Sequence, residues 1–453
     1  GPVPAPRPHA GPDVSELDRE DERFAFIDAA VSAATRDSGR ARADWSDRID
    51  RVTTHRVGGP LVFLAVMWLV FQATTTVAAP LQDALDAFFS GPVAGAASGL
   101  LGFLGLGGGW LEGLLVNGLI AGVGMLLTFV PLMAIMFALL ALLEDSGYMA
   151  RAAVVTDRLM RSIGLPGKAF LPLVVGFGCN VPAISATRIL SHPRQRILTA
   201  LLVPFTSCSA RLTVYMLLAT TFFGADAGTV VFALYLTSIL FVVVVGLALR
   251  HTLWRSMGDE ALVLDLPPYQ RPSLAITAAV TWTRLRGFLK TASGIIVAAV
   301  VAVWLLQSIP AGAGAFGAVP VQDSLYAAAA RGVAPAFAPA GFGAWELVSA
   351  LGVGFVAKEA VLTSWAQTYA VASGDPGDLG AQLVHSFGAA SGGHPLAAVA
   401  AFLVFVLAYT PCVATLTAQL REIGPRWTLF GLAVNLTTAW VAAVAVFQIG
   451  SLL

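Results

Sequence analysis

Charge and cysteine are both scarce in this chain. Only 12% of its 453 residues are charged, with 27 basic side chains balanced by 27 acidic ones, whereas 57% are hydrophobic. So little charge cannot cover the surface of a water-soluble globule, and a net charge of zero argues against a nucleic-acid partner. None of the three cysteines belongs to a CxxC pair, so the sequence predicts free thiols rather than a disulfide framework.

Histidine is missing from the centres of the apolar runs, which argues against an imidazole-built metal site inside a membrane. The alternating strands of a β-barrel, each of roughly ten residues, are missing too. Apolar runs of about twenty residues recur instead, and a helix needs that length to cross about 30 Å of hydrocarbon. The sequence therefore predicts an all-α polytopic membrane protein, with lipid as its surroundings.

Polar residues concentrate at the N-terminus. Residues 1–55 include a charged segment, Ser15 to Thr35, that is expected to be helical, and together they are predicted to be a cytoplasmic lead-in. No signal peptide precedes the first long apolar run, and Gly1-Pro2 is typical of the remnant that tag removal leaves. We therefore expect an engineered or truncated start.

The distribution of Lys and Arg in the short loops orients the predicted spans. In the first half, basic residues flank 169–190 on both sides, so this stretch is predicted to be a re-entrant hairpin with Gly176, Gly178 and Pro182 in its turn. The stretch 80–110 contains no Lys or Arg and is predicted to be an outer connection, although its Gly and Ala leave room for another short span. The predicted helices of this half are 60–79, 111–143 (bent at Pro131), 197–222 and 229–250.

The second half is predicted to repeat the first from the other side of the membrane. The stretch 345–369 contains an interruption, and the loop that follows it, 370–395, has no Lys or Arg and is expected to be external. Each half is then helix, hairpin, helix, helix, with opposite topology, as in many secondary transporters. The predicted helices of this half are 288–308, 396–420 and 427–450, and the predicted regions of the chain are 1–55, 56–110, repeat 1 (111–250), a cytoplasmic linker (251–287) and repeat 2 (288–453).

Two pairs of motifs support this duplication. The sequence GFGCNVP at 176–182 has a counterpart in GFVAKEA at 354–360, and aligning the later motifs places Thr206 on Thr410 and Cys208 on Cys412. Cys179, Asn180 and Ser209, with the two aligned cysteines, supply sulfur and oxygen ligands that suit a borderline first-row divalent metal better than Ca²⁺ or Mg²⁺. The alternative is that these small residues only allow close helix packing.

Charges within apolar sequence mark further candidates, because each would be costly facing lipid. Glu359 is a candidate metal ligand or proton acceptor, with Arg211 as its counter-ion across the repeats. The alternative is a structural ion pair that locks the hairpins. The other candidates along the path are Glu144, Asp145, Met149, Thr410 and Lys358.

Several long motifs resemble one known family. They are SDRIDR at 46–51, LEDSGYMARAA at 143–153, GLPGK at 164–168, GFGCNVPA at 176–183, SCSARL at 207–212, VAKE at 356–359 and YTPCVAT at 409–415. They are similar to the membrane domain of the bacterial ferrous iron transporter B family, over residues 23 to the end. The resemblance implies import of Fe²⁺ as substrate across the bacterial cytoplasmic membrane through two gate-type repeats. It also implies that Cys179, Cys208 and Cys412 belong to the iron path.

The sequence departs from this family in one respect. Members begin with a small GTP-binding domain, but the chain contains neither GxxxxGK[ST] nor an Asn-Lys-x-Asp element. We therefore expect that this chain binds no nucleotide and is not an enzyme, with the GTP-binding domain cut away or supplied separately. Small cytoplasmic accessory proteins are expected partners, and a homo-oligomer is left open.

Two other classes of function remain. A gate-type carrier of organic solutes such as nucleosides could use the same repeats, but it would need aromatic and amide groups in its pocket rather than three thiols. A membrane thiol enzyme would need a paired redox motif or a base beside a cysteine, and the sequence shows neither.

Overall fold

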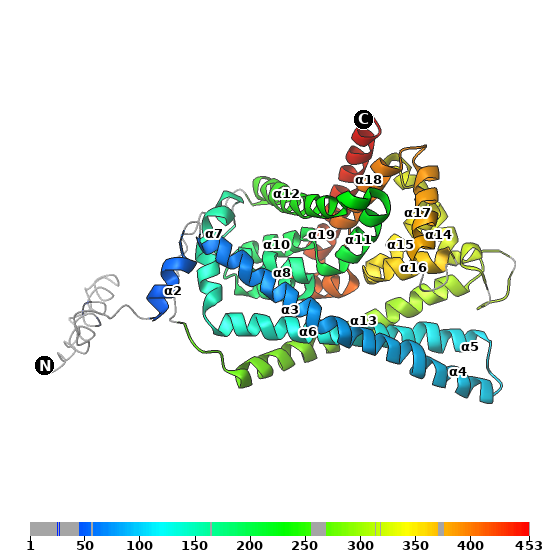
Figure 1. The fold of residues 1–453 in the computed structure, drawn as a ribbon, viewed down its shortest axis with the longest axis horizontal. Coiled ribbons are helices and arrows are strands. Elements are labelled where there is room, and N and C mark those ends of the chain that lie inside the picture. The colour runs from blue at the N-terminus through cyan, green and yellow to red at the C-terminus, as the bar shows by residue number, and fades with distance from the viewer. Residues whose placement is uncertain are drawn as a thin grey trace, which may run out of the picture. The chain divides into compact units, whose positions relative to one another are not determined.

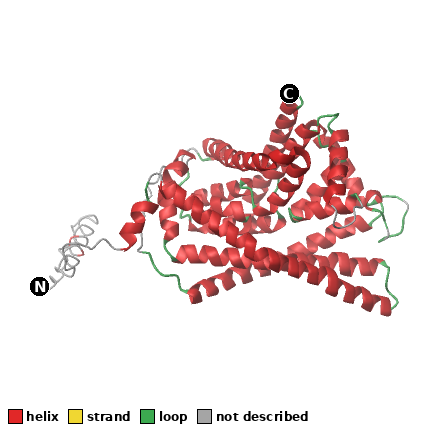
Figure 2. Cartoon of the chain, viewed as in Figure 1, coloured by secondary structure: helices red, strands yellow, loops and turns green. Residues whose placement is uncertain are grey.

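The computed structural model describes Ala25, Ile27 and residues 45–55, 58–163, 165–254, 269–312, 314–317, 319–369 and 376–452. These residues form helices and loops without a β-strand (Figure 2). The chain divides into two units, Gly1–Arg51 and Val52–Leu453. The described part of the first unit is essentially the start of α2 (Trp45–Thr53), and the predicted segment from Ser15 to Thr35 lies almost wholly outside the described residues.

The predicted outer connection at 80–110 is wrong for most of its length. Helix α3 (Gly58–Phe88) passes Pro80 and continues through a π-helical turn into α4 (Ala94–Phe103). A backbone surrounded by hydrocarbon must satisfy its hydrogen bonds internally, and this outweighs the weak helix preference of the Gly residues, whereas Ala is itself a strong helix former. The loop begins only after Phe103, where Gly105 and Gly108 adopt positive φ angles of 71° and 74°.

The remaining helices of the first half follow the predicted spans with one further interruption. The region predicted as a hairpin forms α8 and α9, which pack against each other, and the predicted helix 197–222 is broken at Thr206–Cys208. The helices are α5 (Trp110–Gly113), continuous through a π-helical turn with α6 (Ala121–Asp145), then α7 (Tyr148–Ile163), α8 (Phe170–Gly178), α9 (Asn180–Ala186), α10 (Pro193–Leu202), α11 (Ser209–Phe223) and α12 (Ala227–Leu253).

The second half differs from the predicted spans in three places. Its first helix starts inside the predicted linker, the predicted loop 370–395 is helical from Pro376 to Ala390, and the predicted helix 396–420 is broken at Tyr409–Cys412. Gly424, with φ 79° and ψ 169°, kinks the last helix near the predicted boundary. The helices are α13 (Leu274–Ser308), α14 (Leu325–Val333), α15 (Trp345–Val356), α16 (Ala360–Thr368), α17 (Pro376–Ala390), α18 (Pro395–Ala408) and α19 (Val413–Gly450).

Among the described residues, five helical stretches are long and apolar enough to cross a membrane. A sixth is added if the pair Leu325–Ala340 and Trp345–Val356, bent by 105°, forms one span. The chain is therefore an all-α, multi-pass membrane protein, as the composition predicts. The five stretches are Leu61–Phe103, Trp110–Asp145, Pro193–Leu253, Leu274–Ser308 and Pro395–Gly450.

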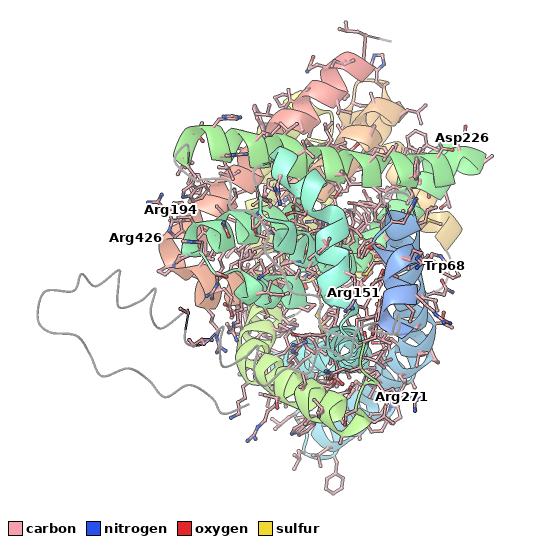
Figure 3. The ribbon with its side chains drawn as sticks, turned by 90° about the vertical axis from the view of Figure 1, so that its left-hand side faces the viewer. Trp68, Arg151, Arg194, Asp226, Arg271 and Arg426 are labelled. Atoms are coloured by element: carbon pink, nitrogen blue, oxygen red, sulfur yellow. The ribbon has the colours of Figure 1, made fainter. Side chains whose placement is uncertain are left out.

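Burial separates the helices of the second unit into two kinds. Helix α18 is apolar all round and ten of its 14 residues are buried, with the Phe402 ring 5.2 Å from that of Phe342 and 5.6 Å from that of Trp365. Along α3, α12 and α13 many large apolar side chains are exposed, and Trp68 of α3 points away from the structure (Figure 3). A helix exposed in this way suits lipid contact, whereas α18 belongs to the protein core.

Helices α3, α6 and α13 pack along one another, α3 on α6 and α6 on α13 (Figure 1). The broken helices α8, α10, α15 and α16 lie at about mid-height in the same view, and α9, α10 and α15 pack on α19. The interruptions of the helices are therefore inside the second unit, where protein rather than lipid surrounds the freed backbone groups.

Candidate functional site: a cavity at four helix breaks

The four breaks fall into two pairs with matching backbone conformations. Cys179 ends α8 with φ −152° and ψ 130°, and its aligned counterpart Ala357 ends α15 with φ −149° and ψ 132°. Cys208 precedes α11 with φ −72° and ψ 160°, and its counterpart Cys412 precedes α19 with φ −65° and ψ 159°. The aligned sequence motifs therefore adopt the same local structure in both halves.

Aligned side chains also connect the two breaks within each half. In the first half, Thr206 Oγ1 donates a hydrogen bond to Asn180 Oδ1 over 3.3 Å. In the second half Lys358, which aligns with Asn180, donates from Nζ to the carbonyl oxygen of Thr410 over 2.7 Å. Ser209 adds a bond to the carbonyl oxygen of Gly178 at 3.0 Å. The neighbouring breaks are thereby held together in both halves.

The break before α11 satisfies its backbone through buried side chains. Ser238 of α12 accepts a hydrogen bond from the Ser207 backbone N–H at 3.1 Å and donates to the carbonyl of Phe205 at 2.7 Å. Arg211, which is fully buried, donates from Nη1 to the Thr206 carbonyl and from Nη2 to the Pro204 carbonyl, both at 3.0 Å. These partners replace the helical hydrogen bonds that the break removes, as an apolar interior requires.

The four breaks enclose one small cavity, here called the thiol cavity, with a volume of about 70 Å³. All three cysteines line it, although they are separated by up to 233 positions in the chain, and each is half-buried with a free thiol. Cys412 Sγ lies 3.2 Å from Thr415 Oγ1, which also lines the cavity. The other candidate residues along the wall are Asn180, Ser209, Arg211, Lys358 and Glu359.

The predicted ion pair between Arg211 and Glu359 is wrong. The Arg211 guanidinium is occupied by the two carbonyls, and no salt bridge joins it to Glu359 in the described part of the chain. Lys358 is buried, with Nζ 3.2 Å from the centre of the Tyr409 ring in addition to its bond to Thr410. Glu359 is half-buried and has no hydrogen bond or ion pair among the described residues. Its carboxylate is therefore the acidic group available to a cation in this cavity.

Among the described residues, no three His, Cys, Asp or Glu side chains lie close enough to hold one metal ion together. The thiol cavity is thus no closed chelating site. It offers single thiols, a carboxylate, and amide and hydroxyl oxygens along its wall.

A larger cavity of about 560 Å³, here called the wide cavity, adjoins the thiol cavity. Glu144 and Met149, two candidates from the sequence, line it, and Glu144 Oε2 accepts from Arg284 Nη2 at 2.7 Å. Asp145 lines neither cavity; its Oδ2 accepts a hydrogen bond from the Ser273 backbone N–H at 2.8 Å. Thr410 lines neither cavity either, and its backbone carbonyl oxygen accepts the hydrogen bond from Lys358 Nζ.

Sequence reasoning missed Glu422, whose side chain is only 4% exposed. It forms ion pairs with Arg188 and Arg196, so that α19 of the second half is tied to the turn after α9 and to α10 in the first. Because Glu422 accepts a hydrogen bond from Arg188 Nε at 2.7 Å, the pKa of Arg188 lies above its ordinary value. The one signal in the sequence was that Glu422 is a single carboxylate between Arg421 and Arg426. This local pattern does not indicate that its partners are Arg188 and Arg196.

Comparison with known proteins agrees with the motifs. A gate-family model described as nucleoside recognition matches residues 126–222 and 289–426, and a model described as the ferrous iron transport protein B C terminus matches 231–284. Two relatives share the printed name Fe(2+) transporter FeoB. The one from Staphylococcus aureus is 39% identical over 412 residues, covering 90% of this chain and 60% of the relative. The one from Methanocaldococcus jannaschii is 35% identical over 451 residues, covering 97% and 64%.

A third relative, from Porphyromonas gingivalis, is named an Fe(2+) transport protein A/Fe(2+) transporter FeoB fusion protein and is 33% identical over 475 residues. The chain covers 95% of its own length in that match and 55% of the relative, so it spans somewhat over half the length of these curated relatives. No solved structure matches the chain. The gate model alone covers more than half of the chain, and with the C-terminal model and these relatives it shows that the chain belongs to the FeoB family of ferrous iron transport proteins.

Proposed function

We propose that this chain moves Fe²⁺ across the bacterial cytoplasmic membrane through the thiol cavity. One observation carries the proposal: Cys179, Cys208 and Cys412 come from three different helix breaks, yet they line the same small space. Thiols that only filled space would have no reason to converge at the points where the backbone is interrupted. The names of the relatives support iron as the substrate.

The chemistry of the wall suits Fe²⁺ in transit. A borderline divalent ion is bound by thiolate, carboxylate and amide oxygen, whereas the hard ions Mg²⁺ and Ca²⁺ prefer oxygen ligands alone. Glu359 supplies a negative charge, and Cys179, Cys208 and Cys412 supply the soft ligands. Although the three thiols share one cavity, no three of these groups among the described residues are close enough to bind one ion together, so each contact is weak enough to be exchanged for the next, which conduction requires.

The matched breaks support a mechanism based on two related halves. If the halves have opposite topology, the thiol cavity lies between two elements that can rock against each other, as in other inverted-repeat transporters. We propose this arrangement on the basis of the aligned motifs and their matching φ and ψ angles.

Partners are proposed from the relatives. Because the chain spans somewhat over half the length of these relatives, a GTP-binding domain elsewhere in the protein or on another chain is proposed to regulate the flux. The name of the Porphyromonas gingivalis relative, which joins transport protein A to the transporter, supports a small accessory protein as a second partner.

The alternative, a carrier of nucleoside-like solutes, takes its support from the description of the gate family. Size opposes it at the thiol cavity, because about 70 Å³ is far below the roughly 300–1,000 Å³ of sites for small organic ligands. The two proposals are separated by measuring uptake of radioactive Fe²⁺ and of radioactive uridine into proteoliposomes that contain the whole chain.

The decisive variant is Cys179→Ser combined with Cys208→Ser. Serine keeps the approximate volume but replaces sulfur by a harder and poorer donor for Fe²⁺, so we expect uptake to fall at least about tenfold at equal protein content. Cd²⁺, which prefers thiolates, should block the unaltered protein and lose its effect on the double variant. Unchanged Fe²⁺ uptake with unchanged block by Cd²⁺ would remove the cysteines from the path.

A further inference from the structure

Three apolar residues belong to the walls of both cavities. Phe288 of α13, Val181 of α9 and Ala414 of α19 line both the wide cavity and the thiol cavity. They come from three helices that are far apart in sequence, and none of them carries a polar side chain. The two cavities are therefore neighbours, separated by an apolar layer.

Phe288 is the bulky member of this layer. Its side chain packs with Cys179 against the cluster of Met133, Phe137 and Leu285. It also packs, with Ala414, against a second cluster, formed by Leu126 and Ile296. Phe288 therefore shares one cluster with Cys179 and another with Ala414, which lies two residues after Cys412.

We propose that Phe288, with Val181 and Ala414, forms an apolar partition that sets the ion specificity of the path by admitting only an ion that sheds its water. The proposal rests on the proposed transport of Fe²⁺ through the thiol cavity. Apolar constrictions exclude water and so oppose the passage of hydrated ions. The ligands of the thiol cavity then determine which ions are compensated for the hydration energy that they lose at the partition.

The sizes of the two cavities support this role. The wide cavity, at about 560 Å³, has room for a fully hydrated divalent ion. The thiol cavity, at about 70 Å³, is about eight times smaller. Mg²⁺ loses its water ligands reluctantly and binds thiols weakly. Fe²⁺ binds thiols better, so these ligands compensate it for the lost waters. The partition therefore lies where the space narrows from the wide cavity to the thiol cavity.

The first test measures the partition without using transport. In a variant whose only thiol is Cys179, a small charged methanethiosulfonate reagent is added to one side of proteoliposomes at a time. With Phe288→Ala we expect the modification rate of Cys179 from the side of the wide cavity to rise at least about tenfold, because an aqueous connection replaces an apolar one. Ile189→Ala is the matched control, since Ile189 lines only the wide cavity and belongs to neither cluster, and it should leave the rate unchanged.

The second test measures the specificity. In the otherwise unaltered chain, Phe288→Ala should lower the ratio of Fe²⁺ to Mg²⁺ influx at least about tenfold, mainly by admitting Mg²⁺. If Phe288→Ala does not fold, Phe288→Leu is used with the same expectations in direction. An unchanged labelling rate, or faster labelling with an unchanged ion ratio, overturns the proposal. Absence of Fe²⁺ flux in the unaltered protein would instead refute the proposed function, while the labelling test of the partition would still stand.

Discussion

The charged residues around the thiol cavity differ in what their charge contacts. The Arg211 guanidinium donates hydrogen bonds to two backbone carbonyls. The Lys358 ammonium donates to a third carbonyl and lies over the Tyr409 ring. A buried charge is tolerated when such partners replace water. Glu359 has no such partner among the described residues, although it is half-buried on the cavity wall. We infer that the two cations stabilise the breaks and that the carboxylate is free to meet the transported ion.

This difference predicts the outcome of Glu359→Gln. The substitution keeps the shape of the side chain and removes its charge, so Fe²⁺ uptake should fall at least about tenfold, which corresponds to only about 1.4 kcal/mol. Because Glu359 has no partner to lose, the melting temperature of the purified protein should hardly change. Uptake into proteoliposomes and thermal unfolding in detergent are measured on the same preparations.

Glu346→Gln is the matched control, since Glu346 lies at the opposite end of α15 and does not line the thiol cavity. It should leave uptake unchanged. Normal uptake by Glu359→Gln together with a lower melting temperature would make Glu359 a structural residue and contradict the inference.

At the scale of the elements, glycine permits the broken helices to approach each other closely. A methyl group added to Gly354 of α15 would lie 2.6 Å from the Tyr409 hydroxyl and 2.7 Å from Cγ2 of Val361. Gly176, the aligned residue of α8, would collide in the same way with Thr206, just before the next break. The two glycines therefore hold equivalent places, each pressed against the second break of its own half.

We predict that Gly354→Ala destabilises the fold. The methyl group must displace Tyr409, whose ring covers the Lys358 ammonium, and overpacking of this kind costs about 1–3 kcal/mol. Thermal unfolding of the purified variant checks the prediction. In Gly388→Ala, on α17, the new methyl group meets open space, and the variant should be neutral or slightly more stable. Equal melting temperatures for the two variants would mean that the close approach of α15 and Tyr409 does not contribute to the stability of the fold.

At the scale of the whole second unit, the two halves are tied together at several points. Glu422 of the second half holds Arg188 and Arg196 of the first, and Gln419 donates from Nε2 to the Ala200 carbonyl at 2.8 Å. Arg194 and Arg426, from the same two regions, appear at one edge of the structure in Figure 3. This concentration of Arg is typical of a cytoplasmic face.

The inverted-repeat hypothesis predicts the sidedness of two exposed loops. Cysteines introduced one at a time at Ser191, beside these arginines, and at His394, in the turn before α18, should be labelled from opposite faces of the membrane by an impermeant maleimide. The background lacks the three native cysteines, and detergent-permeabilised vesicles provide the control for full reactivity. Labelling of both positions from the same face would refute the opposite topology of the halves.

Much of the architecture was predictable from local sequence. The interruptions at Cys179 and at Ala357–Glu359 were expected, because Gly176, Gly178 and the charged pair Lys358-Glu359 cannot continue an apolar helix without cost. The helix through 80–103 was not expected, since its Gly and Pro residues indicate a loop in water but are more frequent in membrane helices. The break at Tyr409–Cys412 was placed inside a helix, although Pro411 was present to indicate it.

The sequence by itself determined the class of the protein, the recurrence of its motifs and the residue types available for iron, because apolar length, aligned repeats and side-chain chemistry are properties of the chain. Only the tertiary structure decided which apolar helices face lipid. In the most apolar window of Pro395–Gly450, 72% of the residues are buried, against 12% in that of Leu274–Ser308. It also decided that Arg211 donates hydrogen bonds to two backbone carbonyls instead of pairing with Glu359, and that three cysteines far apart in the sequence line the same cavity. These outcomes depend on contacts between segments far apart in the chain, and no local pattern encodes such contacts.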